Sequence, residues 1–218
     1  MSTTTPQPAS AEPSTPAPRS QRGTPTWEIA RIYPDQGDWT EEEYLKLSTN
    51  HLVELNDGCL EFLPMPSPYH QFIIKYLLAR LEGHIETNRM GTVLFSPLPV
   101  RLWKGQFREP DLMFFKPERL KDLRKQPDGA DLVMEVVSPG EESRERDLKT
   151  KREEYAKAGI AEYWIVDPEL KTVTVLTLDG DAYKVHGEFQ PGATADSVLL
   201  PGLQIDVTAT FAAGEGTK

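Results

Sequence analysis

The sequence predicts an α/β fold, in which one mixed β-sheet is covered by helices on both faces. Two short apolar runs, Leu112 to Phe115 and Leu132 to Val137, are continuous rather than alternating. Such runs are typical of strands that are buried on both sides. Segments with the helical spacing of apolar residues precede and follow them. The middle of the chain is therefore expected to run helix, strand, strand, strand, helix, strand.

The N-terminal third carries clear signals for short elements. Thr40 and Glu43 form a capping box that predicts a short helix through Leu47. The segment 56–58, Asn-Asp-Gly, lies between two alternating runs and predicts a β-hairpin. Ser67-Pro68 then supplies an N-cap and a first-turn proline for a helix to about Thr87.

The remaining elements follow from apolar runs and turn residues. A helix from about Ser143 is expected to end at Gly159 as a left-handed C-cap. Residues 199–203 are expected to be an extended closing segment. Further strands are predicted at Val93–Phe95, Val100–Trp103, Tyr163–Val166 and Thr172–Leu178.

Chain length and composition limit the number of domains. A chain of 218 residues with 38% hydrophobic content is long enough for one sizeable domain. Residues 1–25 are rich in Thr, Pro and Ser, which predicts a disordered tail because such a segment buries too little surface. We expect a single domain over residues 26–210 and a flexible C-terminus over 211–218.

Charge and cysteine usage narrow the class of protein. The net charge of −10 argues against a protein that coats polyanions, so any nucleic-acid contact would be local. Lys116–Lys125 has five basic residues against two acidic ones, and Arg144–Lys157 has six against four, a pattern that solvated helix faces also produce. The single cysteine, Cys59, fits a reducing compartment. Without an apolar membrane-spanning run or signal core, we expect a cytoplasmic protein with no membrane association.

Two carboxylates lie in apolar surroundings. Asp111 follows Pro110 at the start of one run, and Glu135 lies inside the next. A buried ionised group is costly unless a cation or another partner compensates it. Lys151 is a candidate partner, because Asp147, Lys151 and Tyr155 are spaced by four residues on one helix face. Two carboxylates at strand ends with an ammonium nearby can form a hard-metal site that acts on a phosphodiester.

Each of these candidate site residues could instead have a purely structural role. Asp111 could cap a strand entry, Glu135 could form an ion pair with Lys151, and Lys151 could be solvated. Glu54 alternates within its strand and could point inward as a third acidic group or outward.

For two further side chains the sequence favours a structural role over a functional one. His70, in the first turn of its helix, is expected at the surface or in packing rather than as a ligand. Tyr155 is expected to pack its helix on the sheet rather than to contact a phosphate.

A set of ordered motifs over residues 39–207 carries a family resemblance. They are Val53-Glu54-Leu55-Asn56-Asp57-Gly58, Pro66-Ser67-Pro68 with His70, Glu109-Pro110-Asp111-Leu112, Glu135-Val136-Val137-Ser138-Pro139, then Asp147, Lys151, Tyr155 and Gly159, and Glu162 through Pro168. With these motifs the chain resembles the Uma-type branch of restriction-endonuclease-like proteins in the PD-(D/E)XK nuclease superfamily. The implied fold is a restriction-endonuclease-like core of order αβββαβ, with an N-terminal hairpin and a C-terminal β extension.

The resemblance implies a metal-dependent endonuclease that hydrolyses DNA. Asp111 and Glu135 would be the metal-binding carboxylates, with the Val136 carbonyl as a further ligand. Oxygen ligands suit Mg²⁺, with Mn²⁺ as a substitute, and a Cys/His set with zinc spacing is absent from the sequence. Small nucleases of this class often act as symmetric dimers, so the resemblance also implies a homodimer.

One position departs from the superfamily pattern. The lysine expected two residues after the second carboxylate is Val137 here, and Lys151 on the following helix is the nearest replacement. An ammonium within about 4 Å of the Asp111 and Glu135 carboxylates would be strongly coupled to them. Glu54 would then be an auxiliary acidic residue. The alternative is a catalytically inactive nuclease-fold protein that binds or scaffolds, and RNA or branched substrates stay open.

Overall fold

The computed structural model describes residues 33–49 and 51–216. The disordered tail predicted for residues 1–25 lies outside these ranges. All the helices and strands given below belong to the compact unit that begins at Gln36.

A six-stranded mixed sheet forms the centre of this unit. Its strand order is β10-β9-β8-β7-β6-β3, in which β7 and β8 run parallel and the other neighbours antiparallel. The strands are β3 (Thr92–Phe95), β6 (Leu112–Phe115), β7 (Leu132–Val136), β8 (Glu162–Asp167), β9 (Thr172–Asp179) and β10 (Ala182–Phe189). Every residue of β6, β7 and β8 is buried, as the continuous apolar runs predicted.

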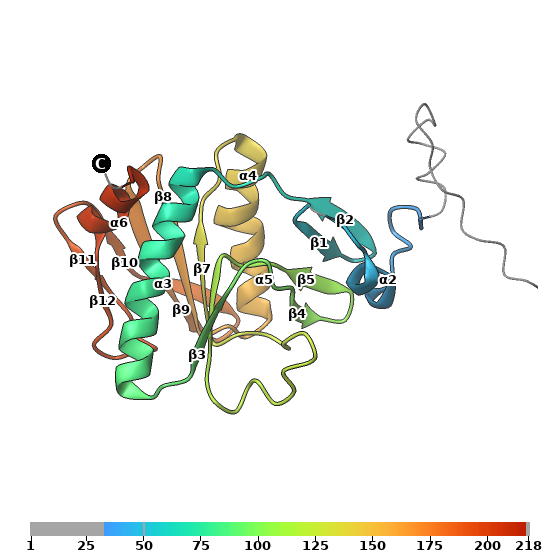
Figure 1. Cartoon of the computed structure of the whole chain (residues 1–218), viewed down its shortest axis with the longest axis horizontal. Helices are drawn as coiled ribbons and strands as arrows, with labels where there is room; N and C mark the ends of the chain where they lie inside the picture. Colours follow the sequence, from blue (N-terminus) through green and yellow to red (C-terminus); the bar gives the residue numbers. More distant parts are fainter. Residues whose placement is uncertain (1–32, 50, 217–218) are drawn as a thin grey trace, which may run out of the picture. The chain divides into compact units, whose positions relative to one another are not determined.

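Helices cover both faces of this sheet (Figure 1). One face carries α3 (Pro68–Asn88) and α6 (Val207–Gly214), and the other carries α4 (Glu141–Glu145), the π-helical turn η1 (Arg146–Thr150) and α5 (Lys151–Lys157). Strand alternation explains the two cores, since Phe114 of β6 packs toward α3 and Met113 packs toward α5. The order α3, β3, β6, β7, α5, β8 confirms the predicted αβββαβ core.

A smaller sheet adjoins this core, with strand order β2-β1-β5-β4. Its strands are β1 (Val53–Asn56), β2 (Cys59–Phe62), β4 (Val100–Trp103) and β5 (Gln106–Arg108). The predicted hairpin is confirmed, with both turn residues, Asp57 and Gly58, at positive φ. The strand predicted at Val100–Trp103 is also present, and it pairs with β5 in this small sheet rather than in the six-stranded one.

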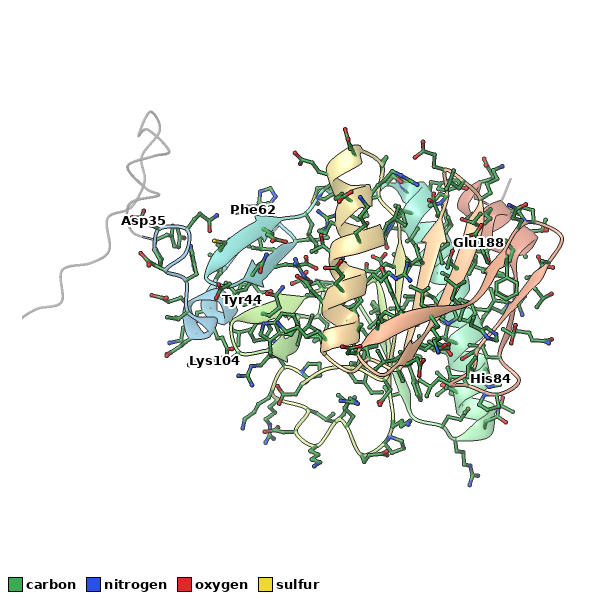
Figure 2. All side chains as sticks on the ribbon, turned by 180° about the vertical axis from the view of Figure 1, so that it is seen from behind. Asp35, Tyr44, Phe62, His84, Lys104 and Glu188 are labelled. Carbon is green, nitrogen blue, oxygen red and sulfur yellow. The ribbon has the colours of Figure 1, made fainter. Side chains whose placement is uncertain are left out.

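The predicted helix starts are also confirmed. Thr40 and Glu43 cap α2 (Glu41–Lys46) reciprocally, and the Ser67 hydroxyl accepts the backbone N–H of His70 at 3.2 Å. Tyr44 of α2 lies against the small sheet and donates its hydroxyl to the Val53 carbonyl at 2.8 Å (Figure 2). None of the helices described is long and apolar enough to cross a membrane.

The helix expected from about Ser143 to Gly159 differs in two ways. It begins at Glu141, directly after Gly140, and a π-turn over Arg146–Thr150 interrupts it. Its end is as predicted, because Gly159 adopts φ +75°. A π-turn widens the helix by one residue per turn, and such turns occur frequently at functional sites.

The extended segment predicted at residues 199–203 is wrong. The fully buried Glu162 carboxylate accepts the Ser197 hydroxyl at 2.6 Å and the backbone N–H groups of Val198 and Leu199 at 2.8 Å. The chain bends around this carboxylate and then closes a turn, with the Leu203 N–H donating to the Leu200 carbonyl at 3.0 Å.

The C-terminal part contains regular structure on both sides of that turn. It consists of the paired strands β11 (Thr194–Asp196) and β12 (Gln204–Asp206), followed by α6. The boundary predicted at residue 210 falls inside α6, and Phe211 of this helix is buried in the core.

Candidate active site

The antiparallel pairing of β6 and β7 brings the two predicted carboxylates together. Leu112 pairs with Met134, so Asp111 and Glu135 lie one step beyond this pair. The Asp111 carboxylate accepts the backbone N–H of Val136 at 2.8 Å. Asp111, Glu135 and Val136 line a cavity of about 50 Å³ together with Leu52, Leu63, Pro64, Pro66, His70, Gln71, Ser96, Glu109, Ser138, Arg146 and Asp147.

Glu135 is held by two side chains of α5. The Lys151 ammonium lies 2.8 Å from Glu135 Oε1, and the Tyr155 hydroxyl donates to the same oxygen at 2.6 Å. The stripe predicted from the four-residue spacing therefore faces the sheet. Tyr155 packs in the core as predicted, and it also fixes one carboxylate oxygen.

Lys151 is the centre of a buried ion cluster. Besides Glu135, its ammonium lies 3.5 Å from Asp147 Oδ1 and 3.6 Å from Glu54 Oε1. Burial alone would lower the pKa of Lys151, but the three carboxylates outweigh burial and raise it, so the ammonium stays charged. The predicted proximity holds for Glu135, whereas Lys151 and Asp111, both described here, form no ion pair.

Glu135 has an unusually high pKa. Burial disfavours its charged form, and the nearby charges of Asp111 and Asp147 do so as well. Lys151 opposes these effects without cancelling them, and the pKa of Glu135 is raised to about 7. A second cation beside the carboxylate would favour its ionised form.

Glu54 points inward, which resolves the alternative left open by strand alternation. It is fully buried, and its two oxygens accept Arg108 Nη1 and the backbone N–H of Glu109, each at 2.8 Å. Burial raises the pKa of Glu54, but the charges of Lys151 and Arg108 lower it by more. Glu54 thus links the small sheet to the segment that leads into Asp111.

Arg108 is a site-supporting residue that the sequence did not single out. Its side chain is fully buried and contacts Glu61 as well as Glu54. Glu154 of α5 accepts two further bonds, from Nε at 2.6 Å and from Nη2 at 2.7 Å. The sequence carries no clear signal for it, because the three-residue strand Gln106–Arg108 was not predicted.

Glu109 borders the same cavity. Burial and the charge of Glu54 raise the pKa of Glu109 to about 7, against a smaller opposing effect of Lys151. Its Oε2 atom is buried and accepts no hydrogen bond from the residues described.

His70 is buried and also borders the site, so of the surface and packing roles expected for it, the surface role is wrong. Its Nε2 lies 2.9 Å from the Val136 carbonyl oxygen and 3.3 Å from Asp111 Oδ2. A carbonyl only accepts, so Nε2 carries the proton and donates to Val136. Burial lowers the pKa of His70, but the Asp111 carboxylate and the Val136 carbonyl together raise it.

The donor set suits a hard cation better than a soft one. The lining includes four acidic residues, among them the two predicted ligands Asp111 and Glu135, and Mg²⁺ is bound in proteins by one or two carboxylates plus waters. The Val136 carbonyl keeps a second lone pair beside the bond from His70. No cluster of three or more His, Cys, Asp or Glu side chains positioned to hold a metal occurs in residues 33–49 and 51–216.

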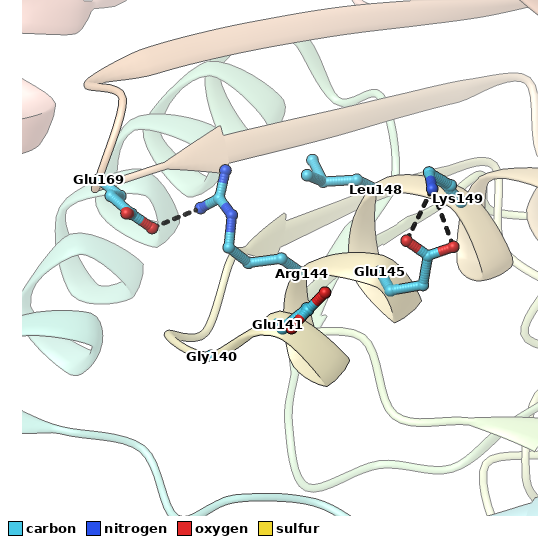
Figure 3. A pocket seen from close by; sticks show the side chains of 7 residues that line it. All are labelled: Gly140, Glu141, Arg144, Glu145, Leu148, Lys149 and Glu169. Atoms are coloured by element: carbon cyan, nitrogen blue, oxygen red, sulfur yellow. Dashed lines mark hydrogen bonds and ion pairs between the residues drawn. The ribbon is translucent and has the colours of Figure 1, made fainter.

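The two basic stretches do not line the cavity as a group. Lys116–Lys125 follows β6 at its C-terminal end, whereas Asp111 lies at its N-terminal end. On the outer side of α4 and η1, Lys149 pairs with Glu145 at 2.7 Å and Arg144 pairs with Glu169 at 3.1 Å (Figure 3). Among the Lys and Arg residues of the second stretch, only Arg146 is part of the cavity lining.

A mixed sheet flanked by helices, with acidic residues at the ends of β6 and β7, defines a protein of the restriction-endonuclease-like fold class. The family model described as "Putative restriction endonuclease" matches residues 41–208, and the chain belongs to this Uma2 family. In a search of curated proteins nothing matches.

A solved structure supports the fold. The chain is similar to a "putative nuclease belonging to DUF820" from Anabaena variabilis, with a TM-score of 0.66 and 19% sequence identity. The similarity covers 81% of this chain and 99% of the other.

Proposed function

We propose that this protein is a metal-dependent endonuclease that hydrolyses phosphodiester bonds of DNA. The observation that carries the proposal is the convergence of Asp111, Glu135 and Val136 on one cavity, with the Lys151 ammonium 2.8 Å from Glu135. Membership of the Uma2 family supports a nuclease role. Mg²⁺ is the proposed cofactor, with Mn²⁺ as a substitute.

Asp111, Glu135 and the Val136 carbonyl would hold the metal ion. A bound divalent ion neutralises phosphate charge and lowers the pKa of a water ligand. Lys151 replaces the strand lysine of the superfamily, whose position is occupied here by Val137. The Lys151 ammonium is fixed between Glu135 and Glu54, where it orients the attacking water or stabilises developing negative charge. Glu54 is the auxiliary residue that holds Lys151 from the small sheet.

Cleavage of a supercoiled plasmid tests this function. The wild-type protein is expected to nick or cut DNA with Mg²⁺ or Mn²⁺ and to stop when EDTA is added. Asp111→Asn removes a proposed metal ligand and should lower the rate by about 10²- to 10³-fold, the scale of losing one strong electrostatic contribution to the transition state. Asp181→Asn, at an exposed turn, is the matched control and should cleave like wild type. Equal inertness of wild type and Asp111→Asn on DNA and RNA substrates would refute the enzymatic function.

A second candidate is a nuclease-fold protein that binds or scaffolds without catalysis. Val137 at the usual lysine position and the net charge of −10 favour it. It differs from the endonuclease in one property that can be measured directly, the uptake of a divalent cation by Asp111 and Glu135.

A further inference from the structure

The π-turn η1 presents two consecutive charged residues to the cavity. Arg146 and Asp147 both line it, and Lys151 follows one turn later beside Asp147. Arg146 thus lines the same cavity as Asp111 and Glu135.

Arg146 makes one long ion pair and no hydrogen bond with its buried Nε. This Nε lies 3.4 Å from Asp147 Oδ1 and has no hydrogen-bond acceptor among the residues described. Asp147 Oδ1 itself accepts no hydrogen bond there. By contrast, Arg108 and Arg144 use their guanidinium groups in short bonds to carboxylates. Buried donors are normally paired, so the open donor of Arg146 indicates a missing acceptor.

The charge of the cavity identifies that acceptor. Its lining includes the carboxylates of Glu109, Asp111, Glu135 and Asp147, and Arg146 is the one Lys or Arg among the lining residues that the structure describes. Lys151 is already shared by three carboxylates. An anion entering beside the metal ligands thus meets one guanidinium with free donors, whose planar fork matches phosphate oxygens.

We infer that Arg146 is the phosphate-binding residue of this site, contacting a non-bridging oxygen of the nucleic-acid phosphodiester next to Asp111 and Glu135. The inference rests on the proposed function and deepens it, because it assigns the group that draws the substrate backbone into an acidic cavity. A purely structural Arg146 would only neutralise Asp147, which already has Lys151 at 3.5 Å and the Ser138 N–H at 3.4 Å.

Binding of a labelled DNA duplex in Ca²⁺, measured by fluorescence anisotropy over a range of KCl concentrations, tests the assignment. Arg146→Met is expected to weaken binding about tenfold, and to reduce the slope of log Kd against log salt by about one, the signature of one lost phosphate contact. Arg146→Lys keeps the charge beside Asp147 and should recover the slope but only part of the affinity. Lys149→Met is the control, because it removes the same charge from the outer side of η1 and should leave affinity and slope within about twofold of wild type.

Cleavage rates separate this inference from the proposed function. Thermal melting first establishes that Arg146→Met is folded. If wild type cleaves DNA and Arg146→Met matches Lys149→Met in kcat/KM, affinity and salt slope, the phosphate-binding role of Arg146 is overturned. The nuclease function is then unaffected. If wild type neither binds nor cleaves DNA or RNA, both are overturned. A loss in Arg146→Met that Arg146→Lys partly restores supports the assignment.

Discussion

Replacement of Arg108 by methionine is expected to destabilise the fold by about 3–5 kcal/mol, the range for breaking a buried ion pair by removing one partner. Its side chain is fully buried among Glu54, Glu61 and Glu154. Methionine fills part of the space but leaves these carboxylates without their shared cation. Urea unfolding of the protein without metal measures the loss.

The same ion cluster supports the site, so the loss should extend to function. Glu54 accepts the Glu109 N–H two residues before Asp111, and without Arg108 this link loses its fixed geometry. Arg101→Met is the matched control, since its ion pairs with Glu41 and Asp128 are partly exposed and should contribute less than about 1 kcal/mol. Equal stability of the two variants would contradict the account of Arg108 as a buried cation on which the site depends.

Replacement of Glu135 by glutamine is expected to stabilise the metal-free protein at pH 8. The pKa of Glu135 rises from an ordinary value of 4.5 to about 7 on folding. Its protonated form therefore contributes stability that is fully present below pH 4.5 and is lost as the pH rises through 7. Two and a half pKa units correspond to at most about 3.4 kcal/mol, and glutamine mimics the protonated acid. The same variant should lose cleavage, because glutamine is a poor metal ligand.

The pH dependence makes this prediction specific. Glu109, whose pKa is also about 7, and His70, whose pKa is raised, shift stability in the same direction. The metal-free wild type should lose stability between about pH 5 and pH 8, and Glu135→Gln should lose less over that interval. Urea midpoints at both pH values measure this difference. A variant less stable than wild type at pH 8 would mean that the ion pair with Lys151 outweighs the cost of burying Glu135.

Most of the fold could be predicted because local signals and burial agreed. The runs at residues 112–115 and 132–136 are buried on both faces, and the caps at Thr40 and Ser67 start the helices where expected. The exceptions depend on distant contacts. The bend at residues 197–203 follows from Glu162, a carboxylate more than thirty residues earlier in the chain.

Part of the candidate site was predictable because two of its residues stand out from the local sequence pattern. Glu135 inside an apolar run and Lys151 on a regular stripe stand out by periodicity. Arg108 and Arg146 do not, because one lies in a three-residue strand and the other in a charge run typical of a solvated helix. The π-turn that contains Arg146 has no local sequence signal of the kind that a proline or a cap provides.

Uptake of Mn²⁺ measured by isothermal titration calorimetry tests the central claim most directly, namely that Asp111 and Glu135 hold a divalent cation. Wild type is expected to bind Mn²⁺ in competition with Mg²⁺ and to release it to EDTA, with binding that strengthens as the pH rises through 7 and Glu135 ionises. Asp111→Asn should bind at least about tenfold more weakly, and Asp181→Asn should bind like wild type. Absence of Mn²⁺ and Mg²⁺ uptake by the folded wild type at pH 8 would contradict the account and favour the scaffold.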